Sequence, residues 1–261
     1  MGTLSTIDAQ DWITSVLALV GAGAWIPQIR EWMRRPEILV VLGEYLEVSF
    51  LDFGAVVNAP CSIASFHRSA LIEDFSLSVT HEQGAHYDFK CVSLSESSTA
   101  QSSSGETTLF GRESKVPTLA LGQDSAAERL VMFRDRGMSA QVRELHHRVI
   151  PVWQRLQAAD GENWRPSMER SEEYAAWLKL LVDGNPWRHG TYNCVMTLRV
   201  RQLSKPVEYR FSFALSDADI AGFRQNGSKW EPYVRSVLLQ RDPPMAKPPA
   251  YFANPTVQKL E

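Results

Sequence analysis

In two neighbouring stretches of the chain, every second residue is apolar. Their apolar positions are Tyr192, Cys194, Met196, Leu198 and Val200 in the first, and Val207, Tyr209, Phe211, Phe213 and Leu215 in the second. A period of two places every second side chain on the same face of a β-strand. The short polar link 202–206 joins them, so the pattern predicts an antiparallel hairpin with one apolar face.

The same alternation predicts further strands over 45–50, 74–80 and 86–91, and two short apolar runs add strands over 38–42 and 62–66. The segment His81–His86 contains a glycine and has the length of a hairpin turn. About seven strands interrupted by helical patterns are typical of a mainly β protein with α insertions, and we expect an antiparallel β-sandwich.

The sequence Gly190-Thr-Tyr192-Asn-Cys194 resembles strand F of immunoglobulin-like domains, where a corner tyrosine precedes a cysteine by two positions. The resemblance covers one strand. It implies an immunoglobulin-like β-sandwich in which Tyr192 is buried and its hydroxyl bonds to the backbone. Cys61 is the candidate earlier cysteine of such a domain, although no tryptophan follows it closely.

Helical patterns lie between and after these strands. Apolar residues at helical spacing predict a helical insertion over 138–183. Ser216 and Asp219 resemble a capping box that opens a short helix, which Asn226-Gly227 would end near Gln225. A second amphipathic helix is expected over 230–240. Seven serines between residues 93 and 104 indicate a flexible loop.

Residues 12–29 carry no charged side chain. This length is just sufficient for a membrane-spanning helix, and glycine and proline are tolerated better in membranes than in soluble helices. A buried soluble helix and a helix lying in the membrane interface are the alternatives. We expect a single-pass anchor whose flanking residues are Trp12, Trp25, Arg30, Arg34 and Arg35.

The charges beside this segment predict its orientation. Asp8 and Asp11 precede it, whereas the basic residues follow it, and positive charge stays on the cytoplasmic side. The C-terminal domain is therefore expected in the cytoplasm. The cysteines Cys61, Cys91 and Cys194 are odd in number and widely spaced, which favours a reducing compartment.

These patterns divide the chain into three parts. We expect a membrane anchor with a basic flank over 1–35 and a β-sandwich domain over 36–242. The sandwich would carry a Ser-rich loop over 93–115 and the helical insertion over 138–183. An extended Pro-rich tail would occupy 243–261.

Composition excludes some classes of function. The 27 lysines and arginines against 30 aspartates and glutamates leave a net charge of −3, which offers nucleic-acid phosphates no general attraction. No P-loop, GxGxxG, GxSxG or HExxH motif is present. No nucleic-acid partner and no cofactor are expected, and a binding role is favoured over an enzymatic one.

One constellation resembles a catalytic site. Asp74 on one strand and Asp88 with Lys90 on the next resemble the D…(D/E)xK core of restriction-type nucleases, whose carboxylates hold Mg²⁺. A solvated sheet face also places polar residues at these positions, and we favour that interpretation. His81 and His86 bracket the predicted turn without identifiable further metal ligands, so we interpret them as surface residues.

Two functional hypotheses follow. The first is a membrane-tethered, cytosol-facing protein-interaction or scaffold module, resembling small bacterial membrane-anchored partners of multi-protein systems. Its partners would be the lipid bilayer and an unidentified protein, and the anchor could support a homo-oligomer. The alternative is a membrane-bound, metal-dependent hydrolase that uses Asp74, Asp88 and Lys90.

Overall fold

The computed structural model describes residues 34–260 except 52, 102–106, 115–117 and 240–247. Its strands are β1 (Glu37–Leu42), β2 (Glu47–Leu51), β3 (Gly54–Phe66), β4 (Ala70–His81), β5 (His86–Gln101), β6 (Thr107–Ser114), β7 (Leu119–Leu121), β8 (Ser125–Asp135), β9 (Gly190–Val200), β10 (Val207–Leu215) and β11 (Gln258–Lys259). Its helices are α2 (Arg136–Asp160), the 3₁₀ helix η1 (Gly161–Asn163), α3 (Trp164–Glu169), α4 (Glu172–Asp183) and α5 (Asp217–Leu238).

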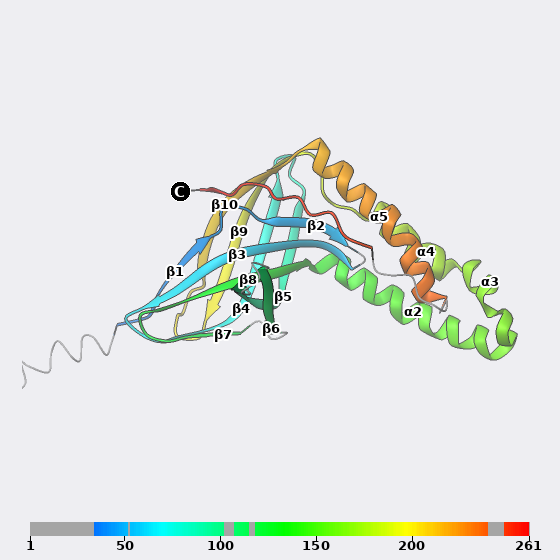
Figure 1. Ribbon diagram of the computed structural model, residues 1–261, viewed down its shortest axis with the longest axis horizontal. Coiled ribbons are helices and arrows are strands. Elements are labelled where there is room, and N and C mark those ends of the chain that lie inside the picture. Colours follow the sequence, from blue (N-terminus) through cyan, green and yellow to red (C-terminus); the bar gives the residue numbers. More distant parts are fainter. Residues whose placement is uncertain (1–33, 52, 102–106, 115–117, 240–247, 261) are drawn as a thin grey trace, which may run out of the picture.

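The strands form one antiparallel sheet that curls on itself (Figure 1). Its main order is β1-β3-β8-β5-β4-β9-β10-β11, while β2 pairs with β3, β6 with β5 and β7 with β4. The predicted mainly β, antiparallel fold is confirmed at this level, and the curled sheet is consistent with a sandwich.

The hairpin of β9 and β10 has the register that its alternation predicts. Tyr192 lies opposite Phe213, and Leu198 lies opposite Val207. The alternate residues of β9 from Tyr192 to Val200 are all buried. With this register the apolar side chains of β9 and β10 lie on the same face of the sheet. They exclude water from the inside of the curl, which stabilises the pairing.

Tyr192 has the surroundings that the immunoglobulin-like resemblance implies. Its side chain is fully buried, and its hydroxyl donates to the Arg188 carbonyl at 2.9 Å and accepts from the Arg188 N–H at 2.7 Å. The ring stacks on Phe213 and meets Trp187 edge-on, and Trp187 donates from Nε1 to the Ser49 carbonyl. The prediction of a buried corner tyrosine is confirmed.

The C-terminal segment 248–260 closes the curled sheet. Ala253 exchanges two backbone hydrogen bonds of 2.9 Å with Val48 of β2, and β11 then pairs with β10. The segment thus bridges β2, which pairs with β3 near one end of the strand order, and β10, which is near the other end (Figure 1). A tail expected to be merely extended is therefore part of the sheet.

Asn226 on α5 holds this segment in place. Its side-chain amide donates to the carbonyls of Tyr251 and Phe50 at 3.0 and 3.2 Å and to the Ser49 hydroxyl at 3.3 Å. Its oxygen accepts from the Tyr251 N–H at 2.7 Å. The residue is fully buried, so these bonds replace all of its contacts with water.

The predicted helix stop at Asn226-Gly227 is wrong, whereas the capping box of Ser216 and Asp219 is confirmed. Helix α5 continues to Leu238, because the Asn226 side chain bonds to the C-terminal segment instead of ending the helix. Gly227 allows α5 to approach α4 closely, since a Cβ there would lie 3.1 Å from the Leu181 carbonyl oxygen of α4.

The Ser-rich segment also differs from its prediction as a flexible loop. Strand β5 runs through it to Gln101, and its residues from Leu94 onward pair with β6. Backbone pairing satisfies the N–H and carbonyl groups of serine as well as those of any residue, so a partner strand overrides the weak strand preference of serine.

The helices α2, α3 and α4 lie between β8 and β9 and form an arm that projects beside the sheet with the end of α5 (Figure 1). The arm has an apolar cluster of its own, made of Val149, Trp164, Met168, Tyr174 and Leu239. The sheet core and this cluster are thus distinct, and they meet where β8 passes into α2.

Two further expectations concern the membrane and the cysteines. No helix within the described residues is long and apolar enough to cross a bilayer, and residues 12–29 lie outside that part of the chain.

Cys61, Cys91 and Cys194 are buried and free. Burial raises the pKa of the Cys61 thiol and of the Cys91 thiol to about 12, which keeps both protonated at neutral pH.

We predict that Asn226→Ala lowers the free energy of unfolding by about 3 kcal/mol, because it leaves buried backbone groups without partners. Urea denaturation followed by tryptophan fluorescence measures the change. Asn193→Ala, at an exposed position of β9, is the control and should stay within about 0.5 kcal/mol of wild type. Equal effects of the two substitutions would contradict the role given to Asn226.

We also predict that Tyr192→Phe destabilises the fold by about 1 kcal/mol, the usual net value of a hydrogen bond. The ring packing against Phe213 and Trp187 stays in this variant, so only the hydroxyl contacts with Arg188 are lost. Thermal unfolding at a fixed scan rate is the measurement. An unchanged midpoint would show that the corner hydroxyl does not stabilise the fold.

Candidate functional site

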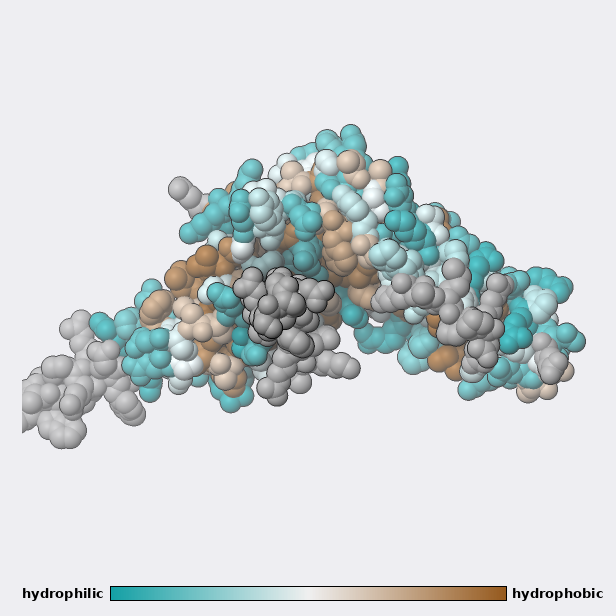
Figure 2. Space-filling model, viewed as in Figure 1, coloured by the Kyte–Doolittle hydropathy of each residue, from teal (hydrophilic) through white to brown (hydrophobic). Residues whose placement is uncertain are grey.

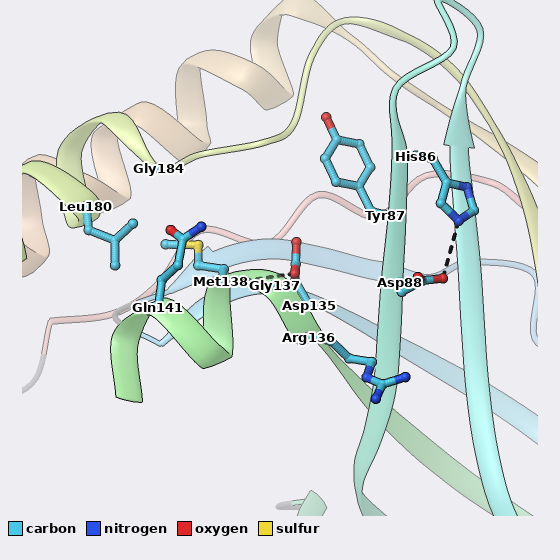
Figure 3. Close-up of a pocket in the computed structure, with 10 residues that line it drawn as sticks. All are labelled: His86, Tyr87, Asp88, Asp135, Arg136, Gly137, Met138, Gln141, Leu180 and Gly184. Atoms are coloured by element: carbon cyan, nitrogen blue, oxygen red, sulfur yellow. Dashed lines mark hydrogen bonds and ion pairs between the residues drawn. The ribbon is translucent and has the colours of Figure 1, made fainter. Parts of the chain in front are cut away.

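A cleft of about 440 Å³ lies where the helical arm leaves the sheet (Figure 3). We call it the arm cleft. Residues from four elements line it. Tyr87 comes from β5, Asp135, Arg136 and Gln141 come from the junction of β8 and α2, and Leu180 and Gly184 come from the end of α4.

The junction of β8 and α2 builds the floor of the arm cleft. Asp135 is the last residue of the strand and also the N-cap of the helix, so no loop separates the two elements. Its Oδ1 accepts a hydrogen bond of 3.0 Å from the Met138 N–H. An N-cap aspartate satisfies one of the free N–H groups of the first helical turn, which fixes its side chain.

The second carboxylate oxygen of Asp135 faces the arm cleft. The residue is only 8% exposed, and Figure 3 shows this oxygen pointing away from α2 into the hollow. Among the described residues, no hydrogen-bond donor contacts it. The cleft therefore presents a carboxylate acceptor whose position is fixed by the helix cap.

Apolar groups form the wall beside this acceptor. Met138 is buried and Leu180 is half-buried, and both border the hollow. The Tyr87 hydroxyl donates to the Pro186 carbonyl at 3.1 Å, which fixes its ring at the other side (Figure 3). A bound molecule would meet a carboxylate next to apolar and aromatic surfaces.

The rim of the arm cleft carries charges of both signs. Arg136 and Gln141 are exposed, and His86 lies 3.3 Å from the Asp88 carboxylate. A second hollow of about 450 Å³ continues along α2 and α4 and shares Gln141, Leu180 and Gly184 with the first. The two hollows form one groove that leads from the sheet along the arm.

The structure separates the residues of the predicted hydrolase site. Asp88 lies opposite Ser78, and Asp74 is four positions farther along β4, opposite Arg199. Four residues of a strand span about 13 Å, too far for both carboxylates to bind one Mg²⁺. Lys90 lies opposite Ser76, between them. The hypothesis that Asp74, Asp88 and Lys90 form one metal-dependent hydrolase site is therefore corrected.

Asp74 instead borders a different hollow, of about 430 Å³, on the outer face of β4 and β9. Arg199 faces it across the strands, and the neighbouring Glu73 and Arg201 form an ion pair at 2.6 Å. Opposite charges compensate one another on this surface, as on a solvated sheet face.

The two turn histidines do not converge. His81 is buried with its Nε2 3.1 Å from the His189 carbonyl and its Nδ1 accepting from the Gln83 N–H. His86 is exposed and faces Asp88. His81 is thus not the surface residue we expected. The described part of the chain contains no group of three or more His, Cys, Asp or Glu side chains that could hold a metal.

The membrane-flanking residues are only partly described. Trp12, Trp25 and Arg30 lie outside the described residues, while Arg34 and Arg35 are exposed directly before β1.

Sequence reasoning missed the arm cleft. One signal was present at Asp135, because an aspartate that ends an apolar strand and precedes a helical pattern is a typical N-cap. Tyr87 and Leu180 carry no such signal, and only the fold brings them beside Asp135.

Comparisons with known proteins find no matching family model and no matching curated protein. One solved structure that the chain resembles is a family 123 glycoside hydrolase from Clostridium perfringens. The two are 9% identical with a TM-score of 0.35, and the match covers 69% of this chain and 27% of that chain. At this level the likeness assigns neither a fold nor an activity to this chain.

The predicted interaction or scaffold module is corrected as well. No described feature of the chain supports a scaffold role.

Proposed function

We propose that this chain binds a small molecule in the arm cleft, and that the molecule carries an amine or another hydrogen-bond donor. The observation that supports this proposal is the second carboxylate oxygen of Asp135, which faces the cleft without a donor among the described residues. The helix cap fixes the position of this carboxylate, so a ligand donor could bond to its second oxygen in place of water.

The size and lining of the cleft suit a small ligand. Its volume of about 440 Å³ is within the range of small-molecule sites. An amine would sit at Asp135, while the apolar part of the molecule would pack on Met138 and Leu180. A longer molecule would extend along the groove between α2 and α4, past Gln141.

We further propose that residues 12–29 anchor the protein in a membrane and that the C-terminal domain lies on the cytoplasmic side. The exposed Arg34 and Arg35 suit the cytoplasmic face of a bilayer, and the three free cysteines suit a reducing compartment. Division of the chain at residue 35 stays a prediction. An immunoglobulin-like relationship is likewise a proposal, supported by the corner tyrosine Tyr192.

We predict that primary alkyl- and arylamines stabilise the full-length protein in detergent, whereas the corresponding alcohols and carboxylic acids stabilise it less. Thermal shift identifies the amines and calorimetry measures their affinities. Asp135→Asn should weaken binding by about tenfold or more, because a hydrogen bond to a charged group is worth about 1.5–3 kcal/mol.

The asparagine variant keeps the helix cap, since asparagine and aspartate cap helices about equally well. Asp217→Asn, in the exposed first turn of α5, is the matched control and should bind as wild type does. Amine binding that survives Asp135→Asn, or no amine binding at all, would refute the proposed site.

For the anchor, we predict that the full-length protein stays in the membrane pellet after extraction with alkaline carbonate. A spanning apolar segment resists this treatment, whereas a protein held only at the surface is released. Release into the supernatant would leave the segment as an interfacial or buried helix.

A further inference from the structure

The outer face of β1 is apolar where a solvent-facing strand is normally polar. Leu39 and Val41 are 50% and 53% exposed, and Phe66 at the end of β3 is 39% exposed. The opposite face of β1 is also apolar, because Val40 is buried in the sheet core. A strand with a core face and a water face alternates apolar with polar residues, so β1 departs from that rule.

These exposed residues form one surface. Leu39 lies opposite Ala64, and Phe66 lies opposite Glu37, so Leu39, Val41, Ala64 and Phe66 point to the same side of the sheet. Ala126 of β8 extends the row beside Ala64. We call these five residues the β1 patch, and Figure 2 shows apolar side chains gathered over β1.

The β1 patch lies directly after the uncharged segment 12–29. Residues 30–36 separate the two and can span at most about 25 Å. If that segment is in a bilayer, β1 is held beside the bilayer surface, where the headgroup layer is about 5–8 Å deep. The position of the chain entry thus favours lipid as the partner of the patch.

Basic and acidic side chains both surround the β1 patch. Arg34, Arg35 and Arg68 are all exposed near it, and the Ser65 hydroxyl bonds to the Arg68 carbonyl at 2.6 Å, which fixes the turn after Phe66. Three acidic residues lie beside them. The Glu37 carboxylate is 3.5 Å from His67, Asp124 accepts from the His67 N–H at 3.0 Å, and Glu128 lies opposite Ser62 on the face of the patch. These charges compensate one another, so the apolar side chains and the position of the chain entry favour lipid as the partner.

We propose that the β1 patch contacts the interface of a lipid bilayer and so orients the domain on the membrane. This inference rests on the proposed membrane anchor and extends it to a face of the folded domain. The helical arm lies at the end of the molecule away from β1 (Figure 1). The arm cleft would then open to the aqueous phase, within reach of a soluble ligand.

The test places a fluorophore on the patch in the full-length protein. Leu39→Cys is labelled with an environment-sensitive dye under native conditions, in which the buried Cys61, Cys91 and Cys194 are protected. The protein is reconstituted into vesicles of phosphatidylcholine and phosphatidylglycerol. We expect a blue-shifted emission that is quenched by doxyl-labelled lipid.

Asn193→Cys, on the exposed face of β9, is the matched control and should keep an aqueous emission without quenching. If the protein resists carbonate extraction while the dye at position 39 stays aqueous, the anchor holds and the patch proposal fails. If carbonate releases the protein, the anchor itself fails. A blue shift that also appears in detergent, with self-quenching between dyes, would show a second copy on β1 and would overturn the lipid contact.

Discussion

The hydrogen bonds between Asn226 and the segment around Tyr251 hold the curled sheet closed. They fix the segment whose backbone pairs with β2 on one side and with β10 on the other, and without that segment the apolar inside of the curl would open between these two strands. Burying the polar amide of Asn226 is favourable only because both of its atoms are bonded. The neighbouring Gly222 supports the same contact, since a Cβ there would overlap the Tyr251 ring.

A second constraint links the sheet to the arm. Because Asp135 ends β8 and caps α2, the direction of the strand sets the direction of the helix. The same residue then faces the arm cleft with its second oxygen, so the geometry of the site follows from the junction (Figure 3). Sites placed on rigid elements hold their polar groups in position better than sites built on loops.

Local patterns predicted much of the fold. The alternation in β9 and β10, the corner position of Tyr192 and the capping box at Ser216 depend on neighbours in the sequence, and the structure contains all three. The extension of β5 through the serines depends on pairing with β6, which no local pattern reveals. Asn226 was misinterpreted for the same reason, because its partners are distant in the sequence.

The candidate site was less predictable than the fold. Tyr87, Asp135 and Leu180 belong to three separate elements, and none of the three belongs to a recognised motif. Asp74 and Asp88 were predicted to lie together because they are near in sequence. They are on neighbouring strands of the same sheet, but they are far apart along the strands. The register of β4 and β5, which the sequence alone did not determine, keeps the two carboxylates apart.

The closing contact has a consequence for the order of events during synthesis. The Ser49 hydroxyl bonds to the Tyr251 carbonyl across 202 positions of sequence. Strand β2 leaves the ribosome long before the segment around Tyr251 is synthesised. Until then the nascent domain has an unpaired strand edge and an open apolar interior. Contacts of such long range slow folding, and an unpaired edge invites association with other chains. Nascent copies of this chain are therefore expected to depend on chaperones until residue 251 has emerged.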